Sequence, residues 1–364
     1  MFNNDIPQTS LINDIRTAKN FGGVTFSNYK KTNVRDQLIR SMVNGKVEPA
    51  CYWAAELICA GHFMELWETI LHYVGKYIHL GNPKLASYLE MRYSIFRNIM
   101  GQGLYVTELD LRNSSKIRCL FAEVICILSL SNKKNSLESI KINRTEEFDM
   151  TQMTDRLKAP NVHFIETVFK KKDPKEIFIP VNEFAYCISA EGLNMRNACY
   201  WIEWIIEFDI LSRNRKEPTY CEKRTDIPVE SKLQRDIIWL IWDCIFERCS
   251  NLQNPFIEKV LQSIFTLFCI KYTSAASKRR RYLLYYAVSL LTEPVPMNIE
   301  LVQNKEIVQN VVSKIHEVYK QIKKSEEAPN TDYLFSGLDS RQNFEESVKR
   351  MEMLQNADFA ARPL

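Results

Sequence analysis

The stretch "ACYW", residues 50–53, decides the fold, because the chain carries it a second time as residues 198–201. The two copies are 148 positions apart, and each follows a glycine and a run of helical periodicity. The apolar residues after the first copy recur at helical spacing, and Pro49 stands where a first helical turn tolerates proline. Small residues followed by aromatic ones suit a helix that packs closely on one neighbour while its rings fill the gaps beside it. Two such helices predict a repeated architecture.

Further motifs recur in the same order. In the first half Trp67 lies 16 residues before Pro83 of an "LGNP" break, and in the second half Trp239 lies 16 residues before Pro255 of "LQNP". The Trp67 stretch, "MELWETILHYVGKYIHL" (64–80), reads as one helix. A third match pairs "KIRCLFAEVICIL" with "RRRYLLYYAVSLL", each basic at its start and apolar afterwards. We therefore predict an all-α array made of two copies of one multi-helix module.

Polar stretches divide the chain around these modules. The second copy is longer than the first because of a polar insertion, and a charge-mixed segment separates the two copies. The expected segments are an N-terminal arm (1–33), a first helical module (34–130), a polar connection (131–175), a second module (176–324) with a polar insertion (212–232), and a tail (325–364) with a short amphipathic helix.

The composition is that of a globular protein from a reducing compartment. Of the 364 residues, 46% are apolar, enough for a large core, and the formal net charge of +4 is too mild to indicate nucleic acid by itself. The ten cysteines lie mostly in apolar runs with no C-x-x-C pair, and no secretory signal opens the chain, so we expect them reduced. No apolar stretch reaches the roughly 18 residues of a membrane span. We expect an intracellular soluble protein.

The residues that carry chemistry in enzymes are sparse. The only histidine cluster comprises His62, His72 and His79. Cys59 and His62 form a possible ligand pair at i, i+3, but a zinc site needs further ligands. Glu56 and Glu203 are acid–base candidates only if they are buried. No G-x-x-x-x-G-K-[ST], G-x-S-x-G, H-E-x-x-H or G-x-G-x-x-G occurs, so we expect no catalytic, cofactor or metal residues and a non-enzymatic protein.

Two basic stretches are candidates for binding a polyanion. The second stretch, residues 278–281, precedes Tyr282, Tyr285 and Tyr286. Cations beside aromatic rings suit phosphates and stacked bases. The alternative interpretation is a solvated basic loop ahead of a core helix. The candidate cations are Arg213, Arg215, Lys216, Lys223 and Arg224 in the insertion, and Lys278, Arg279, Arg280 and Arg281.

The tail is a candidate for docking on a protein partner. Its stripe Phe344, Val348, Met351 and Leu354 has the spacing i, i+4, i+7, i+10 of one helical face. An apolar cluster, Tyr333, Leu334 and Phe335, precedes it. Docking on a partner and folding back on its own core are both open.

The first module resembles the helical C-terminal region of replication-associated recombination ATPases and, more distantly, clamp-loader collar domains. The resemblance rests on Tyr52, Trp53, Gly81, Pro83 and the run 131–135. It implies association of subunits, although the ATPase is missing. The whole chain, rich in Lys, Asn and Ile, also resembles helical proteins of nucleocytoplasmic large DNA viruses.

The expected function is a helical scaffold that self-associates or binds other proteins, in a virion or in viral replication machinery. Such a protein is expected in the host cytoplasm or nucleus, or in the virion. The alternative is a nucleic-acid-binding accessory factor of DNA replication or repair that uses the two basic stretches.

Overall fold

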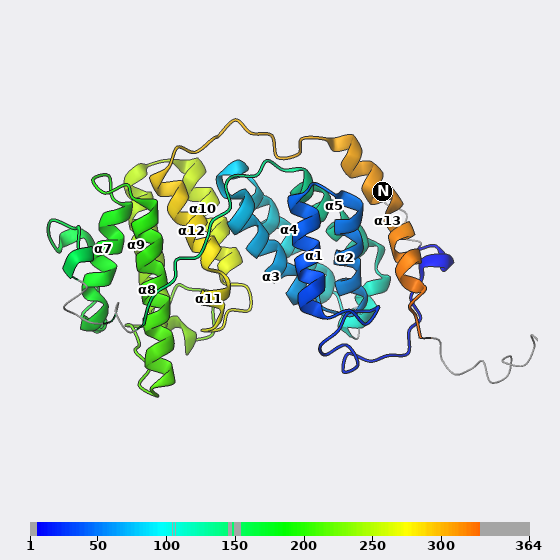
Figure 1. The fold of residues 1–364 in the computed structure, drawn as a ribbon, viewed down its shortest axis with the longest axis horizontal. Helices are drawn as coiled ribbons and strands as arrows, with labels where there is room; N and C mark the ends of the chain where they lie inside the picture. Colours follow the sequence, from blue (N-terminus) through cyan, green and yellow to red (C-terminus); the bar gives the residue numbers. More distant parts are fainter. Residues whose placement is uncertain (1–5, 104, 106, 145–147, 149–153, 328–364) are drawn as a thin grey trace, which may run out of the picture.

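The computed structural model describes residues 6–103, 105, 107–144, 148 and 154–327. Across this part of the chain, helices and turns make up the fold, and the only β-pairing is an isolated bridge between Val24 and Lys30. The prediction of an all-α fold is confirmed. Figure 1 shows an elongated array in which the helices of the first half of the chain lie beside those of the second.

The first module contains five α-helices. They are α1 (Lys31–Val43), α2 (Val47–Cys59), α3 (Phe63–Tyr73), α4 (Leu85–Gly101) and α5 (Ser115–Leu130). Short turns connect them: a π-helical turn, η2 (Val74–Ile78), and 3₁₀ turns η3 (His79–Gly81) and η4 (Glu108–Asn113). The expectation of one α-helix over 64–80 is therefore wrong after Tyr73, where the α-helix gives way to the turns η2 and η3.

The second module repeats this order. Its helices are α7 (Phe178–Ile188), α8 (Met195–Asn214), α9 (Ile238–Leu252), α10 (Pro255–Phe268), α11 (Ala276–Arg279) and α12 (Arg281–Thr292). The two "ACYW" copies lie in α2 and α8, and the two tryptophans Trp67 and Trp239 lie fully buried in α3 and α9.

The helix packing also repeats. The first module pairs α1 with α2, α2 with α5, α1 with α3, α2 with α3 and α4 with α5. The second pairs α7 with α8, α8 with α12, α7 with α9, α8 with α9 and α10 with α12. These five pairs correspond when α1 to α5 are matched in order to α7, α8, α9, α10 and α12. Helix α9 also packs on α10 and α12, and the matching contacts of α3 are weaker or missing. The sequence repeat is thus accompanied by a repeat of contacts, which supports duplication of one module.

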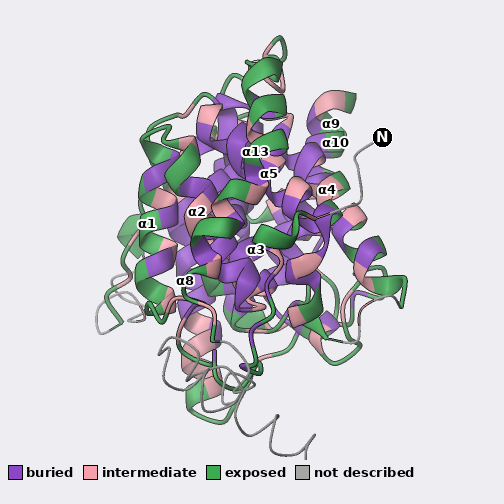
Figure 2. Ribbon diagram, turned by 90° about the vertical axis from the view of Figure 1, so that its right-hand side faces the viewer, coloured by how far each residue is buried: buried purple, intermediate pink, exposed green. Residues whose placement is uncertain are grey.

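The two modules share one continuous apolar core. In Figure 2, buried residues gather in the middle of the molecule and exposed ones on its outer surface. The modules meet where α4 packs on α10 and where α12 packs on η2. Gly75 makes the second contact possible: a Cβ on this residue would lie 2.7 Å from the backbone carbonyl of Tyr282. The backbones therefore approach so closely that only glycine fits between them.

The last described helix, α13 (Lys305–Lys323), returns to the first module. Residues 293–304 run along the top edge of Figure 1, and α13 then packs on α5, α2 and the turn η1 (Gln8–Ser10). Its inner face buries Ile315, Tyr319 and Ile322. By sequence this helix falls within the expected second module, 176–324, whereas in space it completes the first module.

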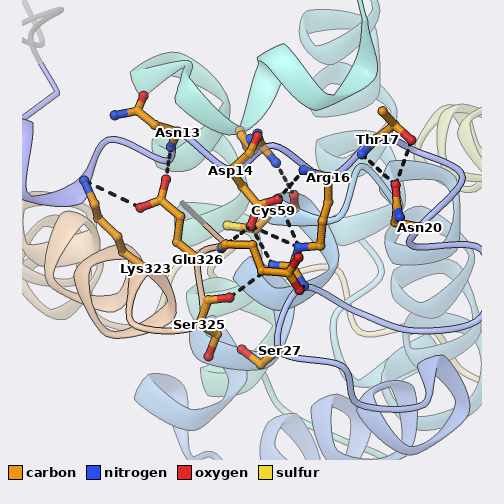
Figure 3. A network of polar contacts seen from close by, with 12 residues as sticks. Asn13, Asp14, Arg16, Thr17, Asn20, Ser27, Cys59, Lys323, Ser325 and Glu326 are labelled. Carbon is orange, nitrogen blue, oxygen red and sulfur yellow. Dashed lines mark hydrogen bonds and ion pairs between the residues drawn. The ribbon is translucent and has the colours of Figure 1, made fainter. Parts of the chain in front are cut away.

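The N-terminal arm holds the end of α13 in place. Arg16 pairs with Asp14 at 2.6 Å and donates to the Ser325 carbonyl oxygen at 3.1 Å, and the Ile15 N–H donates to the Glu327 carbonyl oxygen at 3.3 Å. Figure 3 shows this network, in which Asn13 also reaches Glu326. The N-terminal arm therefore holds the last described residue, Glu327, in place.

Candidate protein-docking groove

An open groove of about 900 Å³ runs between α4, α5 and α13. Helix α5 contacts both other helices, so it forms the floor. The apolar lining comprises Ile95, Ile99, Leu120, Ile127, Val308 and Val312. Figure 2 looks at the molecule from this end.

Each wall of the groove is one face of a helix. On α13 the lining residues Lys305, Val308, Val312 and His316 recur at i, i+3, i+7 and i+11. At 1.5 Å per residue this face is about 16 Å long. A groove lined by helix faces in this way fits an amphipathic helix that inserts residues at i, i+4 and i+7.

Polar side chains of α4, α5 and α13 also line the groove. Arg92 of α4 forms an ion pair with Glu123 of α5, and the Tyr88 hydroxyl donates to the same carboxylate at 3.1 Å. Two further cations, Lys116 and Lys305, also line the groove. Protein interfaces usually combine apolar side chains with polar ones in this way.

A buried arginine fixes α13 beside the groove. Arg118 of α5 is fully buried, donates to the Arg112 carbonyl oxygen at 2.7 Å, and lies 3.9 Å from the centre of the Tyr319 ring. It also contacts His316 Nδ1 at 3.4 Å, and burial together with this cation lowers the pKa of His316. Neutral imidazole is thus favoured, and its nitrogen accepts from the guanidinium.

The candidate cations of the insertion are partly used inside the protein. Arg213 pairs with Asp209 and Asp236, both at 2.9 Å. Arg224 is buried and pairs with Asp173 at 2.6 Å and Asp243 at 3.0 Å. The remaining three, Arg215, Lys216 and Lys223, are exposed. Both arginines therefore tie the insertion to the second module.

The second basic stretch is also paired with carboxylates. The pairs are Lys278 with Glu207 at 2.7 Å, Arg280 with Glu68 at 2.5 Å, Arg281 with Glu203 at 3.1 Å, and Arg279 with Glu68 at 4.0 Å. The rings expected to stack on bases, Tyr282, Tyr285 and Tyr286, are all buried. Lys278 and Arg279 are exposed, while Arg280 is in the core and crosses between the modules to reach Glu68.

The two acid–base candidates are buried in separate modules. Glu56 accepts from Thr25 Oγ1 at 2.9 Å and from the Ser27 hydroxyl at 2.6 Å, which fastens the N-terminal arm to α2. Burial raises the pKa of Glu203, and Arg281 opposes this effect. The Tyr285 hydroxyl donates to Glu203 at 2.9 Å. Each carboxylate therefore has a structural set of partners.

The histidine cluster does not converge on one point. His62 Nε2 contacts the Val24 carbonyl oxygen at 2.8 Å, His79 Nε2 contacts the Asn135 carbonyl oxygen at 3.0 Å, and His72 lies against Tyr282. Within the described ranges, no group of three or more His, Cys, Asp or Glu side chains could hold a metal ion. All ten cysteines are free, and nine are buried; the tenth, Cys119, is half-buried and lines the groove.

A second cavity, of about 820 Å³, lies on the other side of α4. Tyr93 and Arg97 of α4, Cys269 after α10, and Pro228 of the insertion line it. Its lining comes from both modules, and Pro228 is the one residue of the insertion that contributes to it.

The groove was not found from the sequence. The signal available was α5, which is apolar on nearly every face and therefore has to contact more than one neighbour. The return of α13, which supplies one wall, has no local signal because it depends on a long-range contact.

The tail candidates Tyr333, Leu334, Phe335, Phe344, Val348, Met351 and Leu354 lie outside the described residues. Over the described ranges, none of the helices combines the length and apolar character that crossing a membrane requires.

No protein-family model matches this chain, and comparisons with curated proteins and with solved structures give no match.

Proposed function

We propose that the protein is a non-enzymatic helical scaffold that associates with proteins, including copies of itself, through the groove between α4, α5 and α13. The single observation that carries this proposal is the open groove of about 900 Å³, which is lined by apolar side chains of three helices together with polar and charged ones. A contiguous apolar surface of this kind on an otherwise polar exterior marks an interaction site.

One structural observation and one resemblance in the sequence support an association role. The cations and carboxylates singled out as chemical candidates mostly pair with one another inside the protein. The resemblance of the first module to regions through which subunits associate points the same way. We place the scaffold in a virion or in the replication machinery of a large DNA virus.

The test is the molar mass of the purified protein by light scattering. We expect a mass above that of the monomer for the full chain, and a lower mass for Ile95→Asp, because Ile95 lines the groove and is only half-buried. Ile307→Asp is the matched control, since Ile307 lies on α13, outside the groove lining, and is 40% exposed. A monomer under every condition contradicts self-association.

Salt separates this proposal from the polyanion alternative. An apolar interface keeps its mass when salt is added, whereas binding to a polyanion weakens steeply through counterion release. Among the exposed cations, Lys278 is already paired with Glu207 at 2.7 Å, so the polyanion alternative now relies on Arg215, Lys216, Lys223 and Arg279. A titration with DNA or RNA that is lost in a variant with these four changed to Glu, while the mass is unchanged, would favour it.

A further inference from the structure

The groove and the tail stripe match in length and in periodicity. The stripe from Phe344 to Leu354 covers ten residue steps, which is about 15 Å of helix. The groove wall on α13, from Lys305 to His316, covers about 16 Å. Both surfaces repeat every three to four residues, so side chains of one helix can enter the gaps between those of the other.

The tail leaves the structure within reach of the groove. The last described residue, Glu327, is held by the N-terminal arm, and Lys323 Nζ donates to the Gln8 carbonyl oxygen at 3.3 Å. Pro7, which precedes this turn, lines the groove. The intervening residues 328–343 span up to about 55 Å when extended, since each residue covers roughly 3.4 Å. The stripe can therefore reach the groove of its own chain or that of a neighbouring copy.

The charges are complementary as well. The groove lining includes Lys116 and Lys305, and neither lysine forms an ion pair with a carboxylate of the described residues. In the segment 344–354, the three carboxylates Glu345, Glu346 and Glu352 outnumber the two cations Lys349 and Arg350, so its net charge is −1. Opposite charges beside an apolar contact fix the orientation of the docked segment more than they add affinity.

We propose that the occupant of the groove is residues 344–354 of the protein's own tail, docked as an amphipathic helix. This inference rests on the proposed scaffold function and names the segment that the groove binds. A tail bound to a neighbouring copy joins two molecules, whereas a tail bound to its own chain closes the groove.

Cys119 provides a direct probe. It lines the groove and is the only one of the ten cysteines that is not buried. We expect its reaction with a maleimide to be at least about tenfold slower in the full chain than in a chain ending at Glu327, as for a site covered nine-tenths of the time. Cys119→Ser measures background reaction at the nine buried thiols.

A synthetic peptide of residues 338–358 restores the slow rate in the truncated chain, and the same peptide with Val348→Asp and Met351→Asp does not. The full chain carrying these two substitutions reacts as fast as the truncated one. Because these substitutions lie outside the described core, they test docking without removing any described contact. Equal Cys119 rates in the full and truncated chains overturn the inference.

The concentration dependence separates the two proposals. Protection that disappears on dilution together with the oligomer supports the tail of a neighbouring copy and the scaffold. Protection that persists in a monomer at every concentration supports the tail as occupant and contradicts self-association. An oligomer that survives truncation while Cys119 reacts equally in both chains contradicts the inference and leaves self-association in place.

Discussion

At the residue scale, buried charges carry much of the specificity of this fold. Arg224 and Asp173 are each almost completely buried and join the insertion to the segment before α7. Burial opposes ionisation of Asp173, yet the guanidinium and two backbone N–H groups hold its pKa below the usual range. A buried charge is stable only while its partner is present.

We therefore expect Arg224→Ala to lower the free energy of unfolding by about 3–5 kcal/mol, because Asp173 is left buried without its cation. Urea unfolding followed by tryptophan fluorescence measures this change. Lys223→Ala is the control, since Lys223 is exposed and its loss should stay within about 0.5 kcal/mol. Equal effects of the two substitutions would show that the buried pair is not special.

His72 predicts how stability depends on pH. Burial, assisted by Lys76, Arg35 and Arg281, lowers the pKa of His72 to about 4. The unfolded chain then binds the proton more readily than the folded one, so stability is complete above about pH 6.5 and falls as the pH drops toward 4.

The urea midpoint of the natural chain should therefore fall between pH 6.5 and 4.5, and His72→Gln should make this fall shallower. His163→Gln, at an exposed position, is the comparison and should keep the original slope. A slope that His72→Gln leaves unchanged means that the acid sensitivity comes from other groups.

At the scale of the element, the contact between η2 and α12 depends on a missing side chain. Gly75→Ala places a methyl group 2.7 Å from the Tyr282 carbonyl, so we expect a loss of about 1–3 kcal/mol as the two backbones move apart. Gly101→Ala is the matched control, because Gly101 ends α4, a Cβ added there meets no atom within 4 Å, and alanine favours the helix. Calorimetry should show a lower melting temperature for Gly75→Ala alone.

The helices themselves could largely be predicted from the sequence. Periodicity located α1 and α2, and the "ACYW" repeat paired α2 with α8. The break after Tyr73 was missed, because the apolar spacing continues through residues 74–80 while the close approach of α12 at Gly75 is a tertiary effect. Local pattern fixes where a helix forms more reliably than where a neighbour interrupts it.

The candidate site was less predictable than the helices. Basic residues near tyrosines suggested a polyanion surface, but partners distant in sequence use several of them: Glu68 binds Arg280 across 212 positions. Spacing along the chain cannot show such a partner. The groove was missed for the same reason, since its floor and its two walls come from segments around residues 120, 95 and 310.

At the scale of the whole molecule, α13 completes a module that it follows by more than 170 residues. A chain ending at Thr292 leaves uncovered the faces of α2 and α5 that pack on Ile315, Tyr319 and Ile322. Each fully buried side chain of this size contributes about 1.5–3 kcal/mol. We expect this chain to bind a hydrophobic dye and to melt at a markedly lower temperature.

A chain ending at Glu327 keeps α13 and its contacts with the arm and loses only the docked tail, so its melting temperature should fall far less than that of the chain ending at Thr292. A site covered nine-tenths of the time adds only about 1.4 kcal/mol to the stability of the full chain. The pair of truncations thereby separates the structural role of α13 from the docking role proposed for the residues beyond it. Equal melting temperatures for both truncations would mean that α13 contributes little to the fold.

The clasp between the N-terminal arm and the end of α13 has a mechanical consequence. A partner that pulls on the tail applies its force at Glu327, where the arm takes up the load through Ile15 and Asp14. Arg112 donates to the Asp14 carbonyl oxygen at 3.0 Å and carries the strain into the turn before α5. Tension on the tail therefore enters the first module directly. It bypasses the second module, although the second module lies between the first module and the tail in the sequence.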